Sequence, residues 1–151
     1  MPTTTPTDTT LRGLDLFGGL PDDELEALTG LHQLSTAWPG ERLETQDAPV
    51  RAWTLIVCGH AVVEREDTRL GLLGRGESWS EHSLLNGLRS PISVVALAPM
   101  AILRTSREQF FALPEDHPVL AGRLVARSAT SADRLALPVQ AALRHLTAQG
   151  G

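Results

Sequence analysis

The sequence predicts a mainly β fold with helices at both ends, and three observations carry this prediction. Residues 11–31 place leucines at helical spacing, and residues from about 107 onward return to that spacing. Between them, residues 32–113 form short apolar runs separated by Gly, Pro and Asp. Short apolar runs with turn residues between them are typical of an antiparallel sandwich or barrel. We therefore expect one β domain flanked by helices.

The first helix is expected before the strands. Pro21 lies at a first helical position, where its missing amide hydrogen costs nothing, and the acidic residues 22–24 follow at the positive end of the helix dipole. Three leucines then recur at helical spacing, namely Leu25, Leu28 and Leu31. Residues 1–10 are rich in Thr, and we expect them to form a short disordered tail.

Two features of the middle region specify strands more closely. Residues 53–58 carry apolar or small side chains at both odd and even positions, so both faces of that strand are expected to be buried. Residues 66–69 form a polar tip between two strands, which favours a hairpin. The single cysteine, Cys58, excludes an internal disulfide.

The C-terminal region has the pattern of an amphipathic helix. One stripe at steps of three and four residues predicts a helix–helix contact, and its members are Leu120, Leu124, Ser128, Ser131 and Leu135. Pro138 should end or kink this helix. We therefore divide the chain into a tail at 1–10, one domain at 11–135 that includes the C-terminal helix, and a helical tail at 136–151.

The composition narrows the class of protein. The formal net charge of -5 argues against a nucleic-acid-binding surface in this chain. No stretch approaches the roughly 18 apolar residues that a membrane span needs. The N-terminus lacks the basic and apolar regions of a signal peptide. We expect a cytoplasmic protein that binds neither a membrane nor, by itself, nucleic acid.

The stretch from Leu73 to Ala96 has the layout of a phosphate-binding cassette. A turn punctuated by Gly74 and Gly76 leads to an acidic residue that opens a short helix. A strand then follows, entered through an Arg/Ser pair. The first amides of a helix point outward and attract anions, which is the chemistry that such a cassette uses.

The order of these elements resembles the cyclic-nucleotide-binding domain family over roughly residues 11–135. The phrases that carry the resemblance are FGGLP at 17–21, WPGE at 38–41, QDAP at 46–49, VCG at 57–59 and GRGESWSE at 74–81. The resemblance implies a double-stranded β-helix, or jelly roll. Residues 118–148 resemble the dimerisation helix of the catabolite-activator (Crp/Fnr) branch, and the sequence stops about where its winged helix-turn-helix would follow.

The resemblance also implies a set of site residues. Glu81 matches the glutamate that accepts a hydrogen bond from the ribose hydroxyl, and Trp79 and Ser80 replace the usual Phe and Gly. The candidate ligand-binding residues are Gly74, Gly76, Trp79, Ser80, Glu81, His82, Ser83, Arg89, Ser90 and Ser93. Small residues of the C-terminal helix, Ser128, Thr130 and Ser131, lie where the catabolite-activator branch presents Thr and Ser to the base, although a helix–helix interface also explains them.

The phosphate-binding arginine is where this sequence departs from the family. Aligned on residues 94–96, that position falls on Ser90, and the next residue, Pro91, has no amide hydrogen to donate. Arg89 would reach the position through a slip of one residue, which reverses the side chains across a sheet unless a bulge absorbs it. On the unslipped register, two phosphate donors are lost together.

The favoured hypothesis is a non-enzymatic regulatory or sensor module with a degenerate phosphate cassette. It would act through a partner protein or as a homodimer formed by the stripe from Leu120 to Leu135. A genuine cAMP or cGMP receptor that uses Arg89 and Glu81 is one alternative, and a structural or docking subunit is another. Cyclic nucleotide is the ligand that the resemblance implies, and no metal site or catalytic arrangement is indicated.

Overall fold

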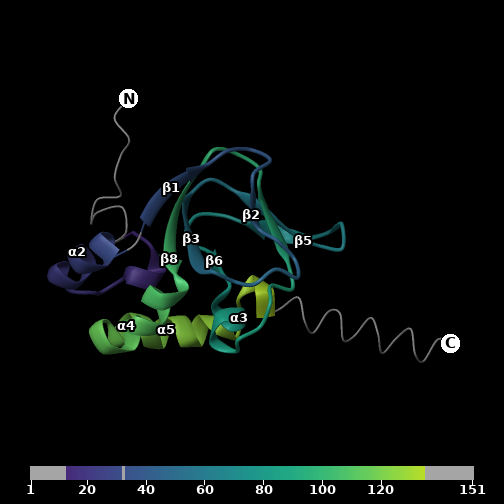
Figure 1. The fold of residues 1–151 in the computed structure, drawn as a ribbon. Coiled ribbons are helices and arrows are strands. Elements are labelled where there is room, and N and C mark those ends of the chain that lie inside the picture. The colour runs from purple at the N-terminus through teal and green to yellow at the C-terminus, as the bar shows by residue number, and fades with distance from the viewer. Residues whose placement is uncertain (1–12, 32, 135–151) are drawn as a thin grey trace.

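A computed structural model describes residues 13–31 and 33–134 of the chain. Two four-stranded antiparallel sheets face each other (Figure 1). The first sheet has the order β1 (Gln33–Ala37), β8 (Met100–Ser106), β3 (Ala52–Cys58) and β6 (Ser78–Trp79). The second has the order β2 (Arg42–Glu44), β7 (Ser93–Ala96), β4 (Ala61–Arg65) and β5 (Thr68–Leu73). The predicted mainly β jelly roll is confirmed.

Helices flank the two sheets. The predicted first helix is divided into a 3-10 turn, η1 (Asp15–Phe17), and α2 (Asp22–Leu31). The others are α3 (Glu81–Leu85), α4 (Arg107–Asp116) and α5 (Pro118–Ser128), and a further helical turn begins at residue 132. In Figure 1, α4 and α5 lie below the sheets and α3 lies near the end of α5. The tails predicted at 1–10 and 136–151 lie outside the described residues.

The hydrophobic core has two parts that share strand β3. Trp53, Leu55 and Val57 pack with the helices and with η1, whereas Ile56 packs in a second cluster between the two sheets. Both faces of β3 are therefore buried, as predicted, and its last residue, Cys58, is exposed. Strand β3 thus links the helical layer to the interior of the jelly roll.

The predicted hairpin joins β4 to β5. Glu66 and Asp67 form its two-residue loop with φ angles of 51° and 64°, and Arg65 pairs with Thr68 on either side. Two consecutive left-handed residues are what a tight hairpin turn requires, because they match the twist of the strands. Strand β5 lies at the edge of its sheet, and its residues 68–72 are exposed.

The leucine stripe of α5 is the main correction to the sequence analysis. Leu120 and Leu124 are 0% and 1% exposed, and they pack in the core cluster that contains η1. Arg123 also ties α5 to η1, because its Nη1 donates to the Leu16 carbonyl at 2.8 Å. An amphipathic helix buries its most apolar face first, and here the protomer itself covers that face. These two leucines therefore do not form a dimer interface.

The other three residues of the predicted interface differ in their surroundings. Ser128 is half-buried and its hydroxyl donates to the Val125 carbonyl of the same helix at 2.5 Å. Ser131 is buried at the entrance to the jelly roll. Leu135 lies outside the described residues.

Candidate ligand-binding site

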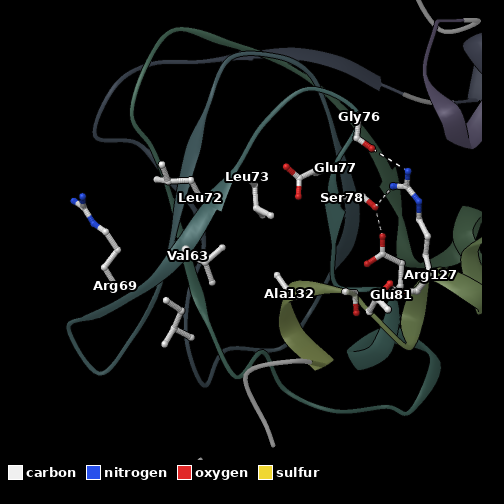
Figure 2. Close-up of a pocket in the computed structure, with 14 residues that line it drawn as sticks. Val63, Arg69, Leu72, Leu73, Gly76, Glu77, Ser78, Glu81, Arg127 and Ala132 are labelled. Carbon is white, nitrogen blue, oxygen red and sulfur yellow. Dashed lines mark hydrogen bonds between the residues drawn. The ribbon is translucent and has the colours of Figure 1, made fainter. Parts of the chain in front are cut away.

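A cavity of about 620 Å³ opens beside the cassette. Its walls come from β4, β5, the turn before β6, the start of α3 and the end of α5 (Figure 2). Val63, Leu72 and Leu73 form an apolar wall opposite a polar group made by Ser78, Glu81 and Arg127. This volume lies within the range of small-molecule sites.

Glu81 occupies the centre of the polar group. Its side chain is 0% exposed, and its Oε1 accepts hydrogen bonds from Trp53 Nε1 at 2.8 Å and from the Ser78 hydroxyl. Its Oε2 is buried without a hydrogen-bond partner among the described residues. Burial raises the pKa of Glu81, and the bonds from Ser78 and Trp53 oppose that rise. Glu81 therefore presents an unused acceptor, or a proton when neutral, inside the site.

Arg127 brings a positive charge to the cavity from α5. Its Nη1 donates to the Ser78 hydroxyl at 2.8 Å, and its Nη2 donates to the Gly76 carbonyl at 3.0 Å (Figure 2). Gly76 has a φ of +84°, a conformation that favours glycine. The guanidinium therefore fastens the end of α5 to the Gly-rich turn. The sequence analysis missed Arg127, because it lies far along the chain from the cassette.

Asp133 holds the amides at the start of α3. Its Oδ2 accepts from the Ser83 amide at 2.8 Å and from the Ser83 hydroxyl at 2.7 Å, and its Oδ1 accepts from the Ser80 amide at 3.3 Å. Asp133 is 0% exposed. These amides at the start of the short helix, which the sequence analysis expected to attract an anion, thus bind a carboxylate of the same chain. The sequence analysis missed this residue too.

Ser80 takes the conformation of the glycine that it replaces. Its φ is +83°, in the left-handed region that favours glycine. The turn is therefore kept at the cost of backbone strain.

Ser90 and Pro91 form a turn that the Ser90 side chain closes. The Ser90 hydroxyl donates to the Ile92 carbonyl at 2.7 Å, and the Ser90 amide donates to the Ala48 carbonyl at 3.0 Å. Neither residue lines the cavity.

Arg89 and Ser93 are also placed away from the cavity. Arg89 is exposed, and its Nη1 donates to the Asp47 carbonyl at 2.9 Å. The Ser93 hydroxyl accepts from the Gln46 amide at 3.0 Å. Neither Arg89 nor Ser93 lines the cavity, and each is bonded to the segment at residues 46–47.

The remaining candidates lie around the cavity. The Gly74 amide donates to Glu77 Oε1 at 3.0 Å, which closes the turn. Trp79 is 0% exposed and packs in the cluster between the sheets. His82 is half-buried, and its Nδ1 lies 3.2 Å from Nδ2 of the Asn86 side chain. Of the ten candidates from the sequence, only Gly76 and Glu81 line the cavity within the described part of the chain.

Three carboxyl groups lie near one another in this region, namely the buried Glu81 and Asp133 and the half-buried Glu44. Burial raises the pKa of Glu44 to about 7, the Trp79 indole and Arg104 oppose the rise, and Asp133 adds to it. Asp133 also contributes to the raised pKa of Glu81. Of these three groups, only Glu81 lines the cavity.

Residues 13–31 and 33–134 contain neither a metal-binding cluster nor a helix suited to a membrane. No group of three His, Cys, Asp or Glu side chains there is placed to hold a metal ion. None of the helices in these ranges has the length and apolar character needed to cross a membrane.

Solved structures provide the comparisons. No protein-family model and no curated protein matches the sequence. The catabolite activator protein of Thermus thermophilus is 27% identical, with a TM-score of 0.68 over 89% of this chain, and the chain spans 62% of that protein. The cAMP-binding acyltransferase of Mycobacterium smegmatis is 25% identical, with a TM-score of 0.64 over 79% of this chain and 38% of that one.

A third structure shows the fold at lower identity. A cAMP-bound mutant of the regulatory subunit of a cAMP-independent protein kinase A from Trypanosoma brucei is 18% identical. Its TM-score is 0.72, and the match covers 87% of this chain and 49% of that chain.

Proposed function

We propose that this chain, which has the fold of the cyclic-nucleotide-binding domain, is a non-enzymatic regulatory module that does not bind cyclic nucleotides through its phosphate cassette. The observation that carries the proposal is the closed turn at Ser90 and Pro91. It offers neither a guanidinium nor an amide hydrogen to a phosphate, and Arg89 is engaged with the Asp47 carbonyl. The module would transmit its signal by a population shift between two positions of its C-terminal helix.

Energetics support this proposal. A hydrogen bond to a charged group contributes about 1.5–3 kcal/mol, so losing the arginine contact alone weakens binding by at least about tenfold. The amides of Ser80 and Ser83 are also occupied, because both donate to the Asp133 carboxylate.

Calorimetry with cAMP and with cGMP tests the proposal. We expect no heat of binding from the full chain with either nucleotide. Micromolar binding that disappears in Arg89→Ala would instead establish the alternative, a cyclic-nucleotide receptor. That alternative is favoured by Glu81, which lines the cavity with its Oε2 free of partners in the described chain. Binding that persists in Arg89→Ala would contradict both accounts and point to another cation of the site.

A homodimer is the second part of the proposal, on a different face of α5 from the one expected. The residues on this face are exposed and apolar or small, and they recur at steps of three and four: Val119, Gly122, Val125, Ala126 and Ala129. Val119 and Val125 are 50% and 56% exposed. Covering such a face removes apolar surface from water.

Analytical ultracentrifugation tests the dimer. We expect Val125→Asp to convert a dimer to a monomer, because it places a charge in the centre of the contact. Leu97→Asp is the matched control, since Leu97 is also exposed, at 44%, but lies on a loop between strands. A wild-type monomer at high concentration would remove the homodimer and leave the structural or docking subunit, which acts through another protein.

A further inference from the structure

We propose that Asp133 is a latch that holds the segment after α5 in the mouth of the jelly roll and keeps the cavity covered on that side. The inference rests on the proposed function, because it describes how that module would change state.

The contacts of the segment are of two kinds. The hydroxyls of Thr130 and Ser131 donate to carbonyls one turn back, those of Arg127 and Ser128, so they only continue the local helical path. The hydrogen bonds of Asp133 span the fold, since they join it to Ser80 and Ser83 about fifty positions earlier. The latch therefore consists of one side chain and the start of α3.

The segment that the latch holds forms part of the cavity wall. Ser131 and Ala132 both line the cavity, and Ala132 packs against the cluster between the sheets that contains Trp79 (Figure 2). Ser131 is 6% exposed and Asp133 is 0% exposed. When Asp133 leaves α3, Ser131 and Ala132 lose their attachment and the cavity opens beside them.

The surroundings explain why this contact is a latch and not a permanent cap. Asp133 lies near two other carboxyl groups, the buried Glu81 on α3 and the half-buried Glu44 on β2, and like charges repel where water is scarce. The positive groups nearby are Arg104 on β8, which faces Glu44, and Arg127, which is bound to Ser78 and Gly76. The hydrogen bonds from Ser80 and Ser83 favour the closed state, and any negative charge on the neighbouring carboxyl groups opposes it.

Hydrogen exchange on the full chain tests the latch. In Asp133→Asn we expect the amides of residues 80–84 and 130–134 to exchange at least about tenfold faster than in the wild type, the factor to which one charge-assisted bond corresponds. Ser83→Ala, which removes one donor and leaves the segment intact, should give a smaller acceleration at the same amides. Asp116→Asn, an exposed aspartate at the end of α4, is the matched control.

The exchange of β3 and β8 shows in the same experiment whether a variant is folded. Unchanged exchange at residues 80–84 and 130–134 in Asp133→Asn, with the strands protected, would overturn the latch. If Asp133→Asn does not fold, the Ser83→Ala variant decides. Faster exchange confined to residues 80–84 and 130–134 in that variant supports the latch, and wild-type exchange there contradicts the latch.

A second measurement reports on opening. Trp38 is 62% exposed, so Trp38→Phe leaves the buried Trp53 and Trp79 as reporters. In that background we expect Asp133→Asn to increase acrylamide quenching, because Ala132 no longer packs against the cluster that contains Trp79. Equal quenching with and without Asp133 would contradict the opening. Neither measurement uses a cyclic nucleotide, so a failed latch and a failed calorimetric prediction are distinguished.

Discussion

Glu44 makes the stability of this domain fall as the pH rises through the neutral range. Burial raises the pKa of its carboxyl from 4.5 to about 7, so between these values the folded state holds a proton that the unfolded chain has released. Stability is therefore highest below about pH 4.5, falls as the pH rises to about 7, and is level above it. Each unit by which the pKa differs between the folded and unfolded states corresponds to about 1.4 kcal/mol. The loss of stability from Glu44 at pH 8 is therefore at most about 3 kcal/mol.

Glu44→Gln isolates this effect. The amide imitates the neutral carboxyl, so we expect the variant and the wild type to be equally stable near pH 4.5 and the variant to be more stable by up to about 3 kcal/mol at pH 8. Urea unfolding of both proteins at half-unit steps of pH provides the comparison. Taking the difference between the two curves removes the contributions of other groups, including Glu81, whose raised pKa acts in the same direction.

The result that refutes this reasoning is a constant difference between the two proteins from pH 4.5 to 8. It would mean that Glu44 releases its proton at the same pH in the folded and unfolded chains. Glu115→Gln, an exposed glutamate on α4, serves as the control for the substitution itself.

Three further substitutions test the fold. Gly59→Ala should lose about 2 kcal/mol or more in urea unfolding, because the residue has a φ of +100° and its new Cβ would lie 2.7 Å from Met100 Cγ; wild-type stability would show that the turn relaxes. Leu124→Ala should lose about 2–5 kcal/mol at every protein concentration, since the side chain is buried within the protomer, whereas a loss that varies with concentration would restore the predicted interface. Ser106→Ala should cost about 1 kcal/mol by removing the capping box of α4, and an unchanged melting temperature would contradict that role.

Local signals in the sequence were enough for much of the fold. The β4–β5 hairpin was predicted from the polar tip at residues 66–69, and the structure places Glu66 and Asp67 in the loop and Thr68 and Arg69 in β5. The turn at Gly74 and Gly76 and the short helix opened by Glu81 were likewise predicted in order. Each of these features is decided by residues within a few positions of one another.

The parts that could not be predicted depend on contacts across the chain. Asp133 and Arg127 are charged residues in a helical region, where the pattern alone indicates a side chain in solvent. Only the folded chain shows that they reach α3 and the Gly-rich turn, about fifty residues away in sequence. The stripe of Leu120 and Leu124 was recognised as a contact face, but periodicity states that a face is buried and not what buries it.

Two arginines one helical turn apart attach α5 to two separate parts of the domain. Arg123 grips the Leu16 carbonyl at the N-terminal end of the domain, and Arg127 grips the Gly76 carbonyl at the rim of the jelly roll. A displacement of α5 along its axis would lengthen both of these hydrogen bonds. The position of α5 is thus tied at once to η1 and to the Gly-rich turn beside the cavity, and a shift of the helix could not leave either contact unchanged.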